Sequence, residues 1–384
     1  MEIRHNRKII YLAGFLFSIP IAITSYINSS FLEAYVGAYY VGIIYVIASI
    51  ITIFGLFKIP KILTYLGNRL TTLIFGSLMF LSFSLLAFVK DVFIVIPAFI
   101  ISFLSINLLF VSLDIFVEDF SKSSNIGSLR GYYLAIINLA WVISQILSGP
   151  IISKSSFAGV YFFGTIFIFA TLLIFILFFR KFKDPEYKKV PVSKTIKSFI
   201  QNKNLSGIYF INLILKFFYA WMVIYTPIYL HEYMNFGWDK IGIMFSMMLI
   251  PFVLVEFPSG KISDKIGEKK MLLLGFFIIS ISTLLIPFIR EPNMWSWVII
   301  LFLSRVGAAF IEVMSESYFF KTINERNADE IDFFRNTTPL SYIIAPLLAI
   351  PVLLFIPSFS YLFFVLGIIL LIGLFITLQI KDIR

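Results

Sequence analysis

Residues 92–113 read VFIVIPAFIISFLSINLLFVSL, a run of 22 residues without a single Asp, Glu, Lys or Arg. As an α-helix rising ~1.5 Å per residue, this run would cross the ~30 Å hydrocarbon core of a bilayer. A transmembrane β-barrel would show segments of ~10 residues with alternating polarity instead. The run is apolar throughout, so it predicts a membrane-spanning helix.

The rest of the chain repeats this pattern. Of its 384 residues, 60% are hydrophobic, whereas a soluble chain is about 45–50% apolar. This composition excludes a soluble globular protein and a disordered chain, and it predicts an all-α integral membrane protein. Charged residues divide the sequence into twelve predicted transmembrane helices: residues 9–32, 34–57, 70–89, 92–113, 131–153, 155–179, 206–229, 238–259, 271–289, 294–317, 333–354 and 359–380. Between the last two we expect the break near Pro351 and Pro357-Ser358.

Six predicted helices lie on each side of a basic segment, residues 180–204. The sequence therefore predicts an N-terminal six-helix bundle (1–179), a cytoplasmic linker (180–204) and a C-terminal six-helix bundle (205–384). The linker carries eight basic and two acidic residues, and Ser193 to Ile200 have the pattern of a short amphipathic helix on the membrane surface. No small-residue cleavage site follows the first apolar run, so we expect that run to remain as helix one.

The distribution of positive charge predicts the orientation. With both termini cytoplasmic, 25 of the Lys and Arg residues fall in cytoplasmic segments and four in external loops. Cytoplasmic loops of membrane proteins are enriched in these residues, so we expect a multi-pass protein of the cytoplasmic membrane. The net charge of +10 is then a property of these loops and does not indicate nucleic-acid binding.

The chain offers little for metal or thiol chemistry. It has no cysteine and two histidines, His5 and His231. This composition excludes thiolate metal sites and cysteine nucleophiles, and it disfavours a zinc centre. We expect no cofactor and no enzymatic activity, because a membrane enzyme would need convergent acid, base or metal groups.

The two halves match at an offset of 200 residues. Val41-Gly42-Ile43 aligns with Ile241-Gly242-Ile243, and Gly67 aligns with Gly267. The basic-acidic pair Lys90-Asp91 aligns with Arg290-Glu291 in the same way. Two parallel repeats separated by a linker are typical of transporters that rock about a central site.

A sequence motif occurs between the predicted helices 238–259 and 271–289. It reads Gly260-Lys-Ile-Ser-Asp264-Lys265-Ile-Gly267-Glu-Lys269. It resembles the signature that the major facilitator superfamily carries between helices two and three and repeats between helices eight and nine. In the first half, Pro60 and Thr64 stand where Gly260 and Asp264 stand in the second. The resemblance implies two pseudo-symmetric six-helix bundles, alternating access, and Asp264 close to Arg130.

By the same resemblance, a cytoplasmic charge network closes the inner side of such a carrier. The alternative is that these are interfacial charges whose side chains extend to the membrane surface. The predicted gate residues are Gly260, Asp264, Lys265, Gly267, Lys269, Asp114, Glu118, Arg130, Glu316 and Arg335.

Ionisable residues within a predicted span cost ~2.5–3.5 kcal/mol each on insertion scales and so indicate function. Lys216 and Arg305 lie about midway along their helices. Two interpretations are open for them: a cationic site for an anionic substrate, or pairing of one of them with Glu312 in a proton-linked switch. A structural alternative is a set of ion pairs and interhelical hydrogen bonds that only fix packing. Glu256 is a further charge within a predicted span, nearer the cytoplasmic side. Helical spacing completes the candidate site with Asn212, Tyr219, Asn138, Trp141 and Gln145.

No Gly-x-x-x-x-Gly-Lys-Ser/Thr motif for nucleotide binding occurs in the chain. We therefore predict a monomeric secondary transporter that moves a small molecule, an organic anion by preference, through the lipid bilayer. We expect proton coupling, with Glu312, Glu256 and Asp114 as the candidate carboxyl groups. Two alternatives are open: an exporter or flippase of drug-like or lipid-like amphiphiles, and a non-transporting receptor or scaffold on the same fold.

Overall fold

The computed structural model describes residues 2–120, 126–180, 182, 184, 192–322, 333–356 and 358–382. Side chains are described over the same ranges except residues 2–7, 118–120, 126–135, 192–195, 256, 257, 259–262, 264 and 265. The described chain is helical and contains no strand. Ten of its helices are long and apolar enough to cross a membrane. The predicted all-α membrane architecture is therefore confirmed.

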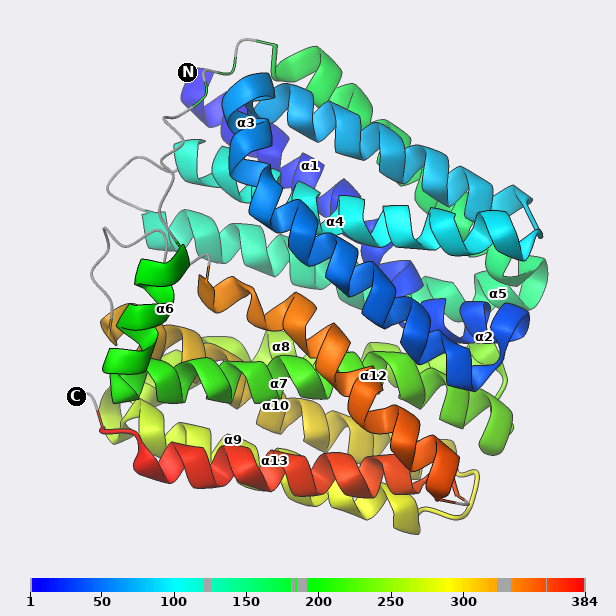
Figure 1. Ribbon diagram of the computed structural model, residues 1–384, viewed down its shortest axis with the longest axis vertical. Coiled ribbons are helices and arrows are strands. Elements are labelled where there is room, and N and C mark those ends of the chain that lie inside the picture. Colours follow the sequence, from blue (N-terminus) through cyan, green and yellow to red (C-terminus); the bar gives the residue numbers. More distant parts are fainter. Residues whose placement is uncertain are drawn as a thin grey trace. The chain divides into compact units, whose positions relative to one another are not determined.

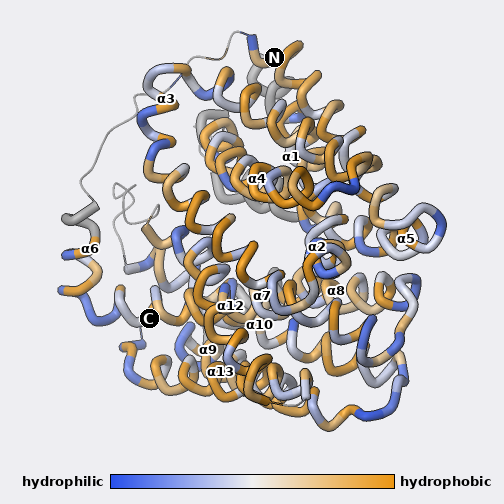
Figure 2. Tube along the Cα trace, turned by 45° about the vertical axis from the view of Figure 1, so that its right-hand side comes forward, coloured by the Kyte–Doolittle hydropathy of each residue, from blue (hydrophilic) through white to orange (hydrophobic). Residues whose placement is uncertain are grey.

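The chain divides into two compact units. Unit 1 comprises Met1–Lys189 and Gly237–Ser246, and unit 2 comprises Val190–Phe236 and Met247–Arg384. Helix α8 contributes to both. Polar residues concentrate toward the helix ends and the connections, while the helix bodies are apolar (Figure 2).

Unit 1 contains five helices in which α3 packs against α4 and α1 packs against α5. Their bounds are α1 (Glu2–Ser25), α2 (Asn28–Val36), α3 (Ala38–Phe88), α4 (Val92–Phe120) and α5 (Ile126–Phe178). Unit 2 brings α9 against α10 and α13, and α7 against α12. Its elements are α6 (Val192–Gln201), α7 (Lys203–Ile228), a π-turn (Tyr229–Tyr233), α8 (Trp238–Ile266), α9 (Glu268–Leu285), a 3-10 turn (Ile286–Phe288), α10 (Met294–Thr322), α12 (Thr337–Phe355) and α13 (Tyr361–Gln379).

Two helices of unit 1 are too long for a single crossing. At 1.5 Å per residue, the 51 residues of α3 would measure about 76 Å if straight, more than twice the hydrocarbon core. Each long helix instead contains one residue with non-helical backbone angles, Gly67 in α3 (φ 73°) and Ser156 in α5 (φ 63°). Figure 1 shows the ribbons of both α3 and α5 turning back along their length.

The structure corrects one predicted boundary and narrows another. The first predicted span, 9–32, is interrupted, because α1 ends at Ser25 and α2 begins at Asn28. Before the break, the Thr24 hydroxyl donates to the Pro20 carbonyl at 2.8 Å, a bond that competes with regular helical pairing. The break predicted near Pro351 and Pro357-Ser358 lies after Pro351, which is inside α12, because that helix ends at Phe355 and α13 begins at Tyr361.

Glycines allow one close helix contact within unit 1. A Cβ on Gly242, in the first turns of α8, would lie 2.9 Å from the Gln145 carbonyl oxygen and 3.0 Å from the Gly149 nitrogen of α5. Both distances are shorter than ordinary Cβ contacts, so only glycine fits at this position. This contact, together with the edge-to-face contact between the rings of Phe157 and Trp238, holds the start of α8 to α5.

The turn at Gly67 is held by a carboxylate that lies 117 residues further along the chain. The Asn68 N–H, at the start of the returning segment of α3, donates to Asp184 Oδ1 at 2.6 Å. Arg69 reaches in the opposite direction and donates to the carbonyls of Phe175 and Ile176 at the end of α5. An acidic group near a helix N-terminus and a basic group near a helix C-terminus both complement the helix dipole.

Unit 2 repeats this arrangement 200 residues later. Gly267 has φ 92° and ends α8, and a Cβ added there would lie 2.7 Å from Asp382 Oδ1. Lys269 Nζ donates to the carbonyls of Leu378 and Ile380, both at 2.8 Å, at the end of α13. We name these two arrangements the paired caps; each is a positive-φ glycine, the carboxylate that approaches it, and the cation two residues later.

The paired caps predict that alanine at Gly67 or Gly267 destabilises the protein more than alanine at Gly37. All three glycines combine positive φ with extended ψ, a backbone region almost restricted to glycine, in which a side chain costs ~1–3 kcal/mol. A Cβ at Gly37 would meet nothing within 4 Å, whereas at the other two it would displace the capping carboxylate, at a further ~0.5–2 kcal/mol. Thermal unfolding of the three purified variants measures the difference, and equal losses of Tm would contradict the role of the caps.

Candidate functional site

The centre of unit 2 holds an ion pair between α7 and α10. Lys216 Nζ lies 2.7 Å from Glu312 Oε1. The Tyr219 hydroxyl, one turn further along α7, donates to the other carboxylate oxygen, Oε2, at 2.8 Å. The side chains of Lys216 and Glu312 are 21% and 26% exposed. Both oxygens of Glu312 are therefore bound from α7, which favours the interpretation in which Lys216 is the partner of this carboxylate.

Arg305 lies two turns before Glu312 on α10 and has a different environment. It is 1% exposed, and its guanidinium carbon lies 4.7 Å from the centroid of the Phe218 ring and 5.9 Å from that of Tyr219. Nε and Nη1 have no hydrogen-bond partner among the described residues. A buried donor without a partner costs ~1–3 kcal/mol, and more when it is charged. The aromatic faces offset part of this cost.

Asn212 lies one turn before Lys216 on α7 and contributes to packing. It is 4% exposed, and its Nδ2 donates to the Thr337 hydroxyl of α12 at 2.8 Å. The Ser341 hydroxyl adds a second contact between the same helices, to the Leu213 carbonyl at 3.2 Å. The predicted polar face of helix seven is thus used on two sides, toward α10 by Lys216 and Tyr219 and toward α12 by Asn212.

The predicted polar stripe of unit 1 is mostly packed between helices. Gln145 is fully buried and its Nε2 donates to the Ala22 carbonyl of α1, while its Oε1 has no partner among the described residues. Asn138 and Trp141, on the same face of α5, are half-buried. Gln145 therefore makes the interhelical hydrogen bond that was the alternative for this stripe.

The predicted gate residues fall into three groups: members of a paired cap, other described residues, and residues whose side chains are not described. Gly267 and Lys269 belong to the unit 2 paired cap. Asp114 is half-buried on α4, and Glu316 and Arg335 are exposed. The remaining predicted gate residues lie outside the described side chains: Gly260, Asp264, Lys265, Glu118 and Arg130. The same is true of the candidate site residue Glu256.

Several charged contacts were not predicted. Glu268 is 1% exposed and forms an ion pair with Lys321 of α10, and the Ser317 hydroxyl lies 3.3 Å from the same carboxylate oxygen. The 200-residue repeat offered a signal, because Glu268 aligns with Asn68, which is also fully buried and donates from Nδ2 to the Ser112 carbonyl of α4. In both units, the residue after the turn glycine joins the returning helix to its neighbour.

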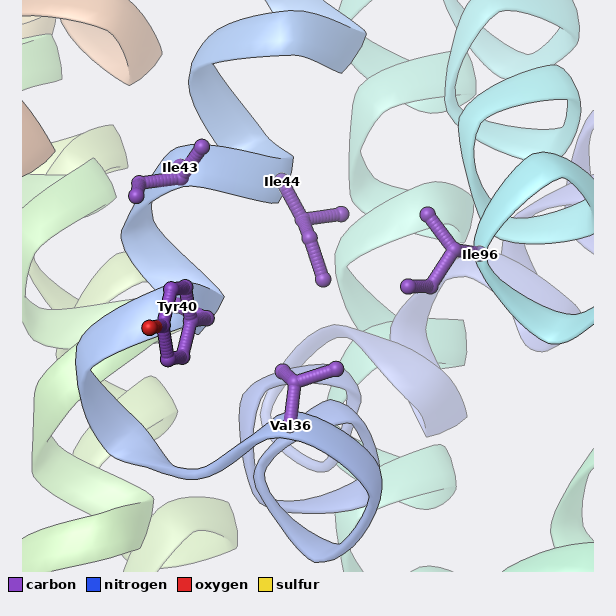
Figure 3. Close-up of a pocket in the computed structure, with 5 residues that line it drawn as sticks. All are labelled: Val36, Tyr40, Ile43, Ile44 and Ile96. Carbon is purple, nitrogen blue, oxygen red and sulfur yellow. The ribbon is translucent and has the colours of Figure 1, made fainter. Parts of the chain in front are cut away.

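An apolar cavity of about 350 Å³ lies on unit 1, where α2, α3 and α4 meet. Its lining in Figure 3 is Val36, Tyr40, Ile43, Ile44 and Ile96. Apart from the Tyr40 hydroxyl, this lining offers no hydrogen-bonding side chain, so the cavity suits an apolar group rather than a charged one. No cluster of three or more potential metal-ligating side chains occurs in the described part of the chain.

The sequence matches a protein family, and over part of its length it matches a relative that is named for the same family. The family model described as Major Facilitator Superfamily matches residues 9–328 and 237–382. The chain is 25% identical over 171 residues to an uncharacterized MFS-type transporter of Methanocaldococcus jannaschii, a match that covers 43% of this chain and 44% of that relative.

Solved transporters share the fold at low sequence identity. A POT family transporter bound to 5-aminolevulinic acid is similar with a TM-score of 0.79 and 12% identity, over 97% of this chain and 95% of that one. The nucleoside transporter NupG is similar with a TM-score of 0.76 and 12% identity, over 97% and 99% of the two chains. Because the family model matches most of the sequence, this multi-pass membrane protein belongs to the major facilitator superfamily.

Proposed function

We propose that the protein is a secondary transporter that moves a small molecule across the cytoplasmic membrane by alternating access. Its working form would be a monomer of two six-helix bundles, residues 1–179 and 205–384, joined by the cytoplasmic linker 180–204. Twelve crossings follow if α3 and α5 each supply two, and the breaks at Gly67 and Ser156 support this count. The charge asymmetry between loops supports cytoplasmic termini.

The observation that carries the proposal is the half-buried pair of Lys216 with Glu312. Intramembrane ionisable residues mark substrate and ion pathways, and transporter sites lie near the middle of the bilayer. This pair is well short of both ends of α7 and α10, with Tyr219 completing the coordination of the carboxylate.

Proton coupling would act through the charge of Glu312. As a carboxylate, Glu312 holds Lys216 on α7 at 2.7 Å. Protonation removes the negative charge and with it the electrostatic part of this contact between helices. A proton would therefore change how firmly α7 and α10 are joined. Glu256 and Asp114 remain further candidates for the same role.

The cargo would be a small molecule, with an organic anion as the preferred class. Solved transporters of this fold include one bound to 5-aminolevulinic acid and one that is a nucleoside transporter, which supports a small polar cargo. The proposed site comprises Lys216, Tyr219, Arg305 and Glu312, with Asn138 and Trp141 as its candidates in the other bundle. The predicted cytoplasmic gate, which includes Asp264, Arg130 and Glu316, would close the inner side.

A second candidate is an exporter of drug-like or lipid-like amphiphiles. The apolar cavity lined by Val36, Tyr40 and Ile96 favours it, because such a cavity accepts an apolar chain. The aromatic residues of α7 do not add support: Phe217 and Trp221 are at most 4% exposed, and their rings contact each other. They belong to the packed core of unit 2.

Proton coupling predicts that Glu312→Gln separates two transport modes. We expect gradient-driven accumulation in proteoliposomes to fall at least about tenfold, because the glutamine cannot exchange a proton, while counterflow of the same labelled cargo continues. The cargo is a compound selected by a rise in Tm from organic anions, sugars and cationic amphiphiles. Glu291→Gln, at an exposed external carboxylate, is the matched control. Wild-type accumulation that persists after the proton gradient is collapsed would contradict this coupling.

A further inference from the structure

Arg305 is a positive charge that the described part of the protein buries without balancing. Its guanidinium stays protonated in proteins, with five N–H donors and no acceptor. Two of its three nitrogens, Nε and Nη1, are buried without a hydrogen-bond partner among the described residues. An unpaired buried charge is among the most costly arrangements in a protein. Such a group is retained when a ligand supplies the missing partner.

The neighbouring carboxylate does not supply that partner. Glu312 lies seven residues along α10, about 10 Å along the helix axis, and its two oxygens bind Lys216 and Tyr219. The charges of Lys216 and Glu312 offset each other. Among the described side chains of this part of unit 2, one uncompensated positive charge therefore remains, at Arg305, and a single negative charge would neutralise it.

The surroundings of Arg305 restrict the shape of the missing group. The rings of Phe218 and Tyr219 lie near the guanidinium carbon, while the unpartnered N–H groups of Nε and Nη1 donate in the guanidinium plane. An oxyanion with two oxygens that accept in parallel matches that fork. The rings around it favour an apolar or aromatic body next to the charged group.

We infer that Arg305 binds the anionic group of a monoanionic substrate, a carboxylate or a phosphate diester with an apolar body, through two parallel N–H···O bonds. Lys216 is not the primary contact of this anion, because Glu312 holds it. This inference rests on the proposed transport function for its biological meaning, but the binding itself does not require transport.

Thermal unfolding of the purified full-length protein tests the inference. The probes are monocarboxylates from acetate to naphthoate, each beside its neutral amide, together with diphenyl phosphate as the phosphate-diester probe. We expect at least one anion to raise Tm in the wild type and in the exposed control Arg290→Gln, while its amide does not. The shift should be lost in Arg305→Gln. In Arg305→Lys the affinity should fall at least about tenfold, because an ammonium group lacks the planar fork.

The outcomes separate anion binding at Arg305 from the proposed transport function. Without ligand, Arg305→Gln should unfold no earlier than wild type, since it removes an unbalanced buried charge; a marked loss of Tm would show a structural role and overturn the inference. The inference also fails if no anion shifts Tm, if amides act equally, or if the shift survives Arg305→Gln. An anion that binds through Arg305 without counterflow in proteoliposomes would reject the transport proposal and leave the binding site standing.

A second and independent feature is the outer face of α6. The helix is held to unit 2 by Phe199, which is 4% exposed and whose ring lies 4.8 Å from Phe333 and 5.5 Å from Tyr209. Ile196 and Ile200, one turn apart, remain 41% and 72% exposed. Figure 1 shows α6 running crosswise to α7, which is the orientation of a helix lying along the membrane surface.

We propose that this face of α6 docks on the anionic headgroup layer of the cytoplasmic leaflet. Its apolar pair would enter the interface, and the basic residues around it supply the complementary charge, because residues 180–204 carry eight basic and two acidic side chains. Lys197 is exposed on the same helix. Apolar burial combined with attraction to anionic lipid is the usual basis for interfacial helices.

The natural absence of cysteine allows a direct test in lipid nanodiscs. An NBD fluorophore is attached to Ile200→Cys, or to the control Gln201→Cys, which is exposed and about 100° around the helix. In nanodiscs containing phosphatidylglycerol, lipid-borne nitroxide should quench the probe at residue 200 at least about threefold more than at 201. Equal quenching at the two positions, or the same quenching in purely phosphatidylcholine discs, would overturn the docking.

Discussion

Within a bilayer, hydrogen-bonding groups must find their partners inside the protein, because the hydrocarbon offers none. Helices satisfy this requirement along their length but not at their ends, which leave several N–H and C=O groups unpaired. The structure meets the requirement at two turns by the same means. Asp184 pairs with the Asn68 N–H after Gly67, and Asp382 approaches the turn at Gly267.

These paired caps tie distant helices together within each unit. The cation of each cap, Arg69 or Lys269, binds the carbonyls at the end of the last helix of its unit. The start of one helix is thereby fixed to the end of another far along the chain. A transporter that rocks two bundles needs bundles that are rigid inside, and these contacts supply rigidity without large buried charges.

The same requirement makes the exception at Arg305 informative. Asn212 has Thr337 as a partner, Gln145 has Ala22, and Glu268 has Lys321. The other buried polar atoms without a partner among the described residues belong to uncharged side chains. Lys216 and Glu312 pair with each other. Among the described ionisable groups of this cluster, Arg305 alone has aromatic neighbours and no acceptor for Nε and Nη1. An intramembrane charge without an acceptor supports the proposed anion site.

The sequence determined the class of the protein, because the length and apolarity of each run are set by the thickness of the bilayer. It also located the turn glycines Gly67 and Gly267 and the mid-helix charges Lys216, Arg305 and Glu312, since each is unusual where it stands. Only the tertiary structure decided their partners. Whether Lys216 or Arg305 would pair with Glu312 depends on the rotation of α7 against α10, which spacing along one helix does not fix. The same holds for Asp184 and Asp382, whose contacts lie more than one hundred residues away and follow from the packing of each unit.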